Sequence, residues 1–242
     1  MHGYSFKLNR ITLTALASGL LWWQERRLLC VSDLHLGKSD RMARRGGALL
    51  PPYENRETLD RLAQAVDALD PLSVICLGDS FDDDAGQNAL DPGDHAQLTT
   101  LMAGRRWIWL EGNHDPGPVN LGGTHMAEYK TGPLVFRHIA KSGAQAEISG
   151  HYHPKASLRM KAGRMSRPCF LIDDKRVILP AFGAYTGGLR CCDPVFEPLM
   201  SAKAVAVLTG TQALPVPMPR AEPSRKSLDA TDKRPTSVTP AQ

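Results

Sequence analysis

The side chains of this 242-residue chain that could do chemistry lie in five short patterns between Asp33 and His153. The patterns are Asp33-Leu34-His35, Gly78-Asp79-Ser80-Phe81-Asp82, Gly112-Asn113-His114-Asp115, His138 and Gly150-His151-Tyr152-His153. Their carboxylates, imidazoles and amide suit ions such as Mn, Fe, Zn or Co. Two such ions held side by side can clamp a phosphate ester and supply the hydroxide that attacks it. The sequence therefore predicts a two-metal site for phosphate ester hydrolysis.

The spacing within the patterns supports this prediction. Asp33 and His35 are two residues apart, as are His151 and His153, so each pair can face one side of a strand end. The two oxygens of Asp79 can each bind a metal, which makes this carboxylate the natural bridge. The candidate metal ligands are Asp33, His35, Asp79, Asn113, His138, His151 and His153.

Two positions leave alternatives open. His138 stands outside any longer motif, so it could be a core histidine, and His125 is a rival ligand. Asp115 follows a Gly-Asn-His sequence that is typical of turns, and we expect it to be a turn residue and not a ligand.

The elements that must position these residues alternate between strand and helix. Apolar runs at 28–32, 72–77 and 106–110 predict buried strands, and each run leads directly into one of the patterns. Apolar residues at helical spacing predict a helix over 54–69, and a second helix is expected over 95–103. This alternation predicts parallel strands, whose carboxyl ends form the binding edge of the sheet.

The second half of the chain predicts a different sheet. Short apolar runs at 133–139, 146–149, 169–173 and 176–180 are separated by tight turns, which favours a second, more antiparallel sheet packed on the first. From residue 215 onward, prolines alternate with charged and small polar residues. We therefore expect a catalytic domain over 1–214 and a disordered, basic, Pro-rich tail over 215–242.

Composition indicates the kind of protein and its cellular compartment more than its function. The hydrophobic fraction is 42%, which is enough for a sizeable core, and the net charge of +4 permits a polyanionic partner without requiring one. The five cysteines are odd in number and lack a C-x-x-C spacing, which predicts a reducing, cytoplasmic compartment. The apolar stretch 11–23 loosely resembles a signal peptide but is too short to span a bilayer. We expect a pair of strands there, with a turn near Ser18-Gly19, and no membrane partner.

Taken together, the five patterns resemble the calcineurin-like metallophosphoesterase superfamily. That superfamily has D-x-H, G-D-x-x-D, G-N-H-D/E, a histidine and G-H-x-H in the same order, and the similarity extends from residue 28 to about residue 188. The resemblance implies an α/β fold, a four-layer α-β-β-α sandwich of two mixed sheets.

The resemblance also implies roles for the site residues. The first ion would take Asp33, His35, Asp79 and His153, and the second would take Asp79, Asn113, His138 and His151. His114 would protonate or stabilise the leaving oxygen, and Asp82 would orient its imidazole. Asp83 and Asp84 are alternatives for that orienting role, and Asp82 could cap the following segment instead.

A narrower similarity concerns the sequence Asp-Leu-His-Leu-Gly-Lys at 33–38, the basic segment with Pro51-Pro52, and residues 181–188. These stretches resemble the PdeM subfamily of bacterial ligase-associated DNA damage response endonucleases. The resemblance implies a metal-dependent phosphodiesterase or nuclease in DNA repair, with a DNA ligase, a helicase and an exonuclease as partners. The tail is not part of this pattern.

Two basic clusters could contact a nucleic acid backbone. They are Lys38, Arg41, Arg44 and Arg45, and Lys155, Arg159, Lys161, Arg164 and Arg167. Solvated surface is the alternative for both, but each begins next to predicted metal ligands, which favours phosphate contact. We expect Lys38, Arg45 and Tyr185 to bind substrate. The glycines around Tyr185 could form a loop over the phosphate or simple turns.

Three functions compete. The first is a manganese-dependent phosphodiesterase or nuclease that acts on DNA, with RNA as another substrate. The second is a phosphomonoesterase or a phosphodiesterase for a small nucleotide such as a cyclic one, since the metal motifs are common to all of these. The third is a scaffold without catalysis, which would normally lack His114 or several ligands that this chain retains. A homodimer could form through the Trp- and Leu-rich N-terminal hairpin.

Overall fold

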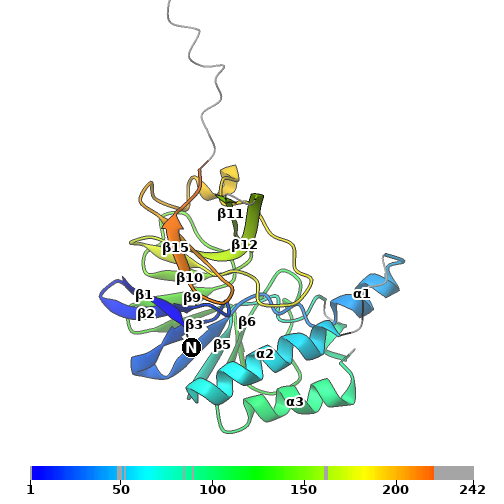
Figure 1. Ribbon diagram of the computed structural model, residues 1–242. Helices are drawn as coiled ribbons and strands as arrows, with labels where there is room; N and C mark the ends of the chain where they lie inside the picture. The colour runs from blue at the N-terminus through cyan, green and yellow to red at the C-terminus, as the bar shows by residue number, and fades with distance from the viewer. Residues whose placement is uncertain are drawn as a thin grey trace, which may run out of the picture.

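The computed structural model consists of two β-sheets packed face to face, with two long helices against the outer side of one of them (Figure 1). It describes residues 2–47, 51, 53–83, 85–88, 90–160 and 163–220. No helix within these ranges is long and apolar enough to cross a lipid bilayer.

The first sheet places its strands in chain order. Its strands are β1 (Gly3–Leu8), β2 (Ile11–Leu16), β3 (Leu21–Trp23), β4 (Leu28–Val31), β5 (Ser73–Cys76), β6 (Arg106–Leu110) and β7 (Thr124–Met126). The pairings from β1 to β4 are antiparallel, and those from β4 to β7 are parallel. The strand pair expected over 11–23 is confirmed, because β2 and β3 pair across the predicted turn.

The second sheet is also mixed. Its order is β15 (Leu214–Pro217), β14 (Val205–Leu208), β12 (Gly163–Ile172), β13 (Arg176–Ile178), β10 (Glu147–Ser149), β9 (Leu134–Arg137) and β8 (Glu128–Thr131). Strand β11 (Lys155–Met160) pairs only with β12 and lies off this path. Strands β9, β10 and β13 are parallel neighbours, and the other pairings are antiparallel.

Three apolar clusters hold the layers together. The central cluster joins the two sheets, with Ile75 and Ile108 on one side and Ile148 and Phe170 on the other. A second cluster packs α2 (Glu54–Leu69) and α3 (Pro92–Met102) on the first sheet, through the predicted apolar stripe that includes Leu62. The α/β sandwich of two mixed sheets is thus confirmed.

The third cluster covers the outer face of the second sheet. Phe196, Leu199 and Met200 pack there on Leu171 and Ile178. Among the described residues, this layer contains the short 3₁₀ helix η3 (Pro194–Phe196) and no α-helix. The remaining helices are α1 (Lys38–Arg44), η1 (Gln24–Arg26) and η2 (Gly86–Asn88).

The predicted boundary of the tail at residue 215 is wrong. Residues 214–217 form β15, which pairs with β14 in the register Val205↔Pro217 and Val207↔Pro215. Proline cannot donate to a strand ladder, but β15 is the edge strand, where one side needs no donors. The Met218 amide then donates to the Ala204 carbonyl, so the domain continues past the expected boundary. Residues 221–242, the rest of the predicted tail, lie outside the described residues.

Candidate metal centre

Both sheets deliver the predicted site residues at the carboxyl ends of their parallel strands. Asp33 and His35 follow β4, Asp79 and Asp82 follow β5, and Asn113 and His114 follow β6; from the second sheet, His138 follows β9, and His151 and His153 follow β10. Because neighbouring parallel strands end at the same edge, both sheets contribute to one site.

The first group that could hold an ion consists of Asp33, His35 and His153, whose ligand atoms lie within 4.8 Å of one another. His153 Nε2 is 3.1 Å from Asp33 Oδ1 and 3.5 Å from His35 Nε2. Asp33 is fully buried and also accepts hydrogen bonds from the Ser32 hydroxyl and the His151 amide. Burial favours a raised pKa for Asp33, but the bond to His153 and the nearby histidine charges outweigh it and lower the pKa.

The second group consists of Asp79, His138 and His151. His138 Nε2 lies 2.9 Å from Asn113 Oδ1, 3.3 Å from Asp79 Oδ2 and 3.2 Å from His151 Nδ1. The structure therefore brings His138 into the site. A third group among the described residues, His35, Asp82 and His114, comes from the first sheet alone, and the rival His125 belongs to none of the three.

These donors fit divalent ions. The Nδ1 atoms of His35 and His138 lie 2.8 Å from the Asp82 carboxylate and the Leu77 carbonyl, so each donates its one neutral-state proton there. The Nε2 atom of His138 then has no proton, and its lone pair faces an amide oxygen, a carboxylate and another imidazole. A cation between them satisfies all of these acceptors together, which a single proton cannot do.

Five of the predicted ligands adopt a left-handed backbone conformation. The φ angles are 53° at Asp33, 47° at His35, 48° at Asp79, 70° at His151 and 45° at His153. Such a conformation costs a residue with a side chain about 1–2 kcal/mol. Strain of this kind persists where the surrounding structure imposes it, and it is concentrated at functional sites. Here these conformations occur directly after β4, β5 and β10.

Close packing explains the glycine of the last motif. A β-carbon at Gly150 would lie 1.7 Å from the Ser32 hydroxyl oxygen and 2.6 Å from Asp33 Oδ2. Only glycine lets the loop after β10 approach the loop after β4 this closely, and this approach joins the two sheets at the site.

The prediction that the Asp82 carboxylate contacts His114 is wrong, because a different group of Asp82 makes the contact. The Nδ1 atom of His114 lies 2.8 Å from the backbone carbonyl of Asp82. The carboxylate instead contacts His35 Nδ1 at 2.8 Å and accepts a hydrogen bond from Arg41 Nη1 at 2.8 Å. Burial favours a raised pKa for Asp82, but these bonds and the charge of Lys38 lower it well below its usual range. The side chain of Asp82 thus orients the candidate ligand His35, and its backbone carbonyl orients His114.

Arg41 lies at the site, although it was not among the three residues expected to bind substrate. Besides its bond to Asp82, its Nη1 atom lies 3.4 Å from His114 Nδ1. Its position three residues after Lys38 on α1 could have indicated this, since residues three apart share a helix face. The Lys38 ammonium is 3.9 Å from Asp82, whereas Arg45 is exposed at the end of α1.

Asp115 stabilises the loop that carries Asp79. It is buried and accepts hydrogen bonds from the backbone amides of Asp79, Ser80 and Phe81 at 2.9, 2.8 and 3.1 Å. Burial, with the nearby Asp79 charge, raises the pKa of Asp115 to about 7 in spite of these bonds. The expectation that Asp115 is not a ligand agrees with this position, since its oxygens are occupied by backbone donors.

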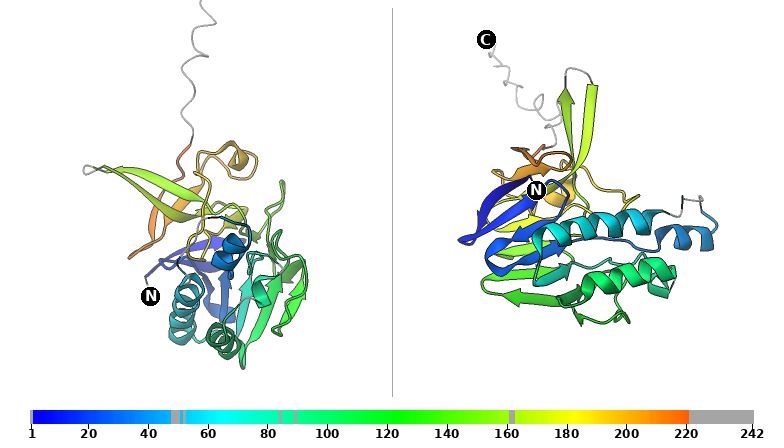
Figure 2. Two further views of the ribbon diagram at one scale, coloured as in Figure 1. Left: turned by 90° about the vertical axis from the view of Figure 1, so that its right-hand side faces the viewer. Right: turned by 60° about the horizontal axis from the view of Figure 1, so that its bottom comes forward.

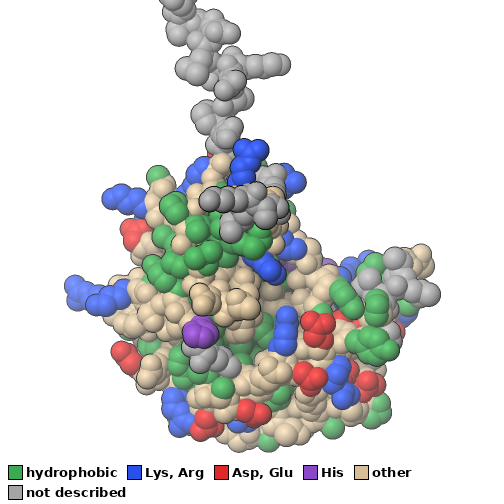
Figure 3. All heavy atoms as spheres, in the orientation of Figure 1, with side chains coloured by type: hydrophobic (Ala, Val, Ile, Leu, Met, Phe, Trp, Pro, Cys, Tyr) green, Lys and Arg blue, Asp and Glu red, His purple; other side chains and the backbone are tan. Residues whose placement is uncertain are grey.

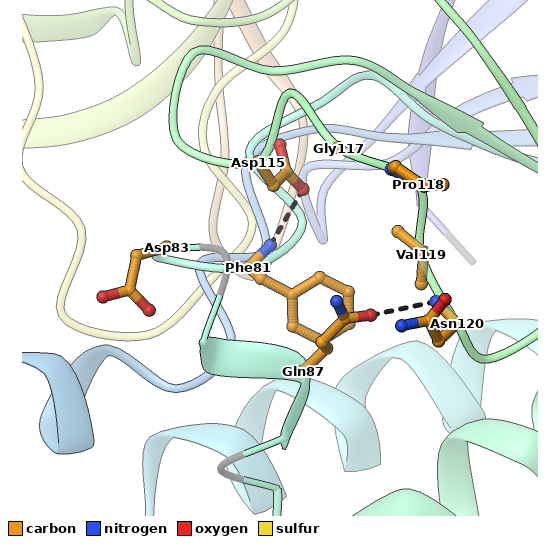
Figure 4. A pocket seen from close by; sticks show the side chains of 8 residues that line it. All are labelled: Phe81, Asp83, Gln87, Asp115, Gly117, Pro118, Val119 and Asn120. Carbon is orange, nitrogen blue, oxygen red and sulfur yellow. Dashed lines mark hydrogen bonds between the residues drawn. The ribbon is translucent and has the colours of Figure 1, made fainter.

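A pocket lies beside Asp115 and Phe81, lined also by Asp83, Gln87 and residues 117–120 (Figure 4). Asp83, Gln87 and Asp115 already have partners. The Gln87 side-chain oxygen accepts from the Asn120 amide, and Asp83 pairs with Arg44 of α1. The pocket therefore adds no candidate ligand to the site.

The glycine-containing loop 181–188 lies against the site and is firmly held. The amides of Phe182 and Gly183 donate to the Ser32 and Asp33 carbonyls at 2.9 and 3.0 Å. Helix α2 holds the other side, where Thr58 accepts from the Ala184 amide at 3.0 Å and Arg61 donates to the Phe182 carbonyl. The loop is thus a fixed wall, from which Tyr185 protrudes with 44% of its surface exposed.

The sequence over residues 26–156 matches the calcineurin-like phosphoesterase family. This match spans more than half of the chain, and the chain belongs to that family. It is a hydrolase that acts on phosphoester bonds. No curated protein matches the sequence. Among solved structures, the Pseudomonas putida nuclease MPE is 27% identical, with a TM-score of 0.68 over 88% of this chain and 100% of that one.

Proposed function

We propose that this protein is a two-metal phosphodiesterase that cleaves DNA. The observation that carries the proposal is the convergence of two candidate ligand groups at one edge of both sheets. It is supported by the similarity of 88% of the chain to a protein described as a nuclease.

The ligand groups divide between two ions, for which Mn²⁺ is the ion we favour. Asp33, His35 and His153 would hold the first; His138 and His151, with Asn113, would hold the second; Asp79 would serve both. This mixture of carboxylate, amide and imidazole suits manganese, and iron, zinc or cobalt fit the same donors. When bound, two such ions supply a hydroxide at neutral pH and offset the charge that develops on the phosphate.

The chain's own residues then prepare the leaving group and the phosphate. As an imidazolium, His114 donates a proton to the leaving oxygen from Nε2, while its Nδ1–H stays bonded to the Asp82 carbonyl. Arg41 and Lys38 place positive charge beside this imidazole and attract the phosphodiester. Arg45 and Tyr185, both exposed, contact the flanking nucleotides.

The setting that we propose is DNA repair in a bacterial cytoplasm, beside a DNA ligase, a helicase and an exonuclease. Its support is the similarity of 33–38 and 181–188 to the PdeM subfamily, together with five cysteines that are all unpaired. The Trp- and Leu-rich hairpin expected to form a homodimer is β2–β3, which lies inside the sheet with β1 at its edge. A homodimer stays a prediction, which light scattering of the purified protein tests.

The decisive experiment compares three substrates with the purified protein and added Mn²⁺: a chromogenic phosphodiester, the matching monoester and a labelled single-stranded DNA. We expect cleavage of the diester and the DNA, and its loss in Asp79→Ala. Cleavage of the monoester alone would contradict the proposal and favour a phosphomonoesterase. Cleavage of the chromogenic diester and of cyclic nucleotides without DNA would favour a small-nucleotide phosphodiesterase.

A further inference from the structure

A two-stranded hairpin projects from the second sheet. Strand β12 pairs with β14 only through residues 169–172, while its first half pairs with β11 from Lys155↔Pro168 to Met160↔Gly163. Six residues of each strand therefore extend past the sheet, over about 20 Å. Figure 2 shows the hairpin standing away from the body of the molecule.

The two faces of the hairpin differ. Opposed residues of an antiparallel pair lie on the same face, so Ala156, Leu158 and Met165 share one face, and they contribute to the outer apolar cluster of the second sheet. The other face carries Lys155, Ser157 and Arg159 from β11 and Ser166 from β12. Arg159 and Ser166 are exposed. We call this second face the polar face.

The hairpin concentrates the positive charge of the protein. Residues 155–168 contain five Lys and Arg and no Asp or Glu, whereas the whole chain has a net charge of +4, so the rest of the chain is close to neutral. No carboxylate of the described residues pairs with Lys155 or Arg159, although Arg27, Arg56 and Arg137 on the body all have acidic partners. Figure 3 shows Lys and Arg mixed with Asp and Glu over α2 and α3.

The polar face begins at the metal centre. Lys155 follows His153 by two residues, and its ammonium donates to the Thr186 carbonyl in the loop 181–188 at 3.3 Å. Its backbone amide donates to the Leu189 carbonyl at 2.8 Å. From Lys155 to Arg159 the strand then advances about 13 Å, a distance that spans about two to four phosphates of one strand.

We propose that the polar face of the β11–β12 hairpin binds the sugar–phosphate backbone of one nucleic acid strand as it leaves the metal centre. This inference rests on the proposed function, which it extends by naming the surface that holds the chain of the substrate. Lys155 and Arg159 neutralise successive phosphates, and the small serines between them let the backbone lie close to the strand. Because these contacts involve phosphate and not bases, they are independent of sequence.

The test compares two arginines of the same hairpin. Arg159→Gln removes a cation from the polar face, and Arg167→Gln removes an exposed cation opposite Ala156, on the other face. Binding of a fluorescent single strand of about 20 nucleotides is measured by anisotropy from about 50 to 200 mM salt, with Ca²⁺ in place of Mn²⁺ to limit cleavage. Turnover of the DNA and of the chromogenic diester is measured with Mn²⁺.

We expect Arg159→Gln to weaken DNA binding roughly three- to tenfold and to reduce the salt slope by about 0.7, the contribution of one phosphate contact on a single strand. The chromogenic diester is too short to reach the hairpin, so its turnover stays at the wild-type level. Equal effects of Arg159→Gln and Arg167→Gln would overturn the assignment of a face. Unchanged binding by Arg159→Gln, with wild-type DNA cleavage intact, would overturn the inference while the proposed function stands. If wild type cleaves the diester but neither binds nor cleaves DNA, both fail.

Discussion

The two sheets contribute different chemistry to the site. The first sheet supplies all the carboxylates and the amide, together with His35 and His114, from the loops after β4, β5 and β6. The second sheet supplies only imidazoles, from the loops after β9 and β10, and also carries the basic hairpin. One side of the site is thus rich in oxygen donors and negative charge, and the other is rich in nitrogen donors and positive charge.

Neither sheet holds a complete set of ligands. The first group draws Asp33 and His35 from one sheet and His153 from the other; the second draws Asp79 from the first and His138 and His151 from the second. Metal binding and the packing of the sandwich are therefore expected to depend on each other. Substitutions of candidate ligands on each sheet can separate what the two sheets contribute to metal binding and stability.

The largest effect is expected for Asp79→Ala, because Asp79 is the carboxylate that we propose both ions share. This variant should lose both ions and at least about a thousandfold in turnover, about 4 kcal/mol of transition-state stabilisation. His151→Ala, on the second sheet, leaves the first group intact and should retain one ion. Elemental analysis of the dialysed proteins, with diester turnover, checks the difference. Equal metal content in the two variants would contradict the shared role of Asp79.

The next effect concerns His114, whose group with His35 and Asp82 comes from the first sheet alone. His114→Ala should retain both ions and lose about 10²- to 10⁴-fold in turnover for diesters with poor leaving groups. Diesters with good leaving groups need little protonation and should lose much less. A plot of turnover against leaving-group pKa measures this dependence, and a slope equal to that of wild type would exclude a general acid at this position.

These comparisons also indicate what could be predicted from sequence. The candidate ligands after β4, β5 and β6 could be placed at one site because buried runs lead into recognisable motifs, and local periodicity is a property of sequence. His138 could be placed only in three dimensions, where it lies beside Asn113 although 25 residues separate them. The true partners of the Asp82 carboxylate depend on where α1 lies relative to the loop after β5, which the helical spacing of Lys38 and Arg41 alone does not fix.

The other errors have the same origin. The left-handed conformations at the ligands are imposed by packing between loops, as at Gly150, and carry no signal in the residues themselves. Strand β15 was missed because its prolines indicate disorder unless an edge position is available, and the edge exists only once β14 is in place.

A smaller effect tests the corrected role of Asp82. Asp82→Asn keeps the backbone carbonyl that holds His114 but weakens the bond to His35 and the pair with Arg41. We expect the affinity for one ion to fall about 10- to 100-fold, as is usual for groups that orient a metal-binding histidine. At saturating metal, the dependence on leaving group should match that of wild type. A changed dependence at saturating metal would instead support the predicted role of the carboxylate in orienting His114.

The smallest effect is on stability, and it tests whether the ions join the sheets. An ion at a hundred times its dissociation constant stabilises the folded state by about 2.7 kcal/mol, which shifts the melting temperature of a domain of this size by about 5–10 °C. Chelation should lower the melting temperature of wild type by that amount and leave Asp79→Ala unaffected. His138→Gln and His125→Gln form a matched pair, because only His138 lies in a ligand group that spans both sheets. His125→Gln should respond to the chelator as wild type does, while His138→Gln should respond less. If His125→Gln lost the response instead, the second ion would lie at the outer edge of the first sheet, and only the first ion would join the two sheets.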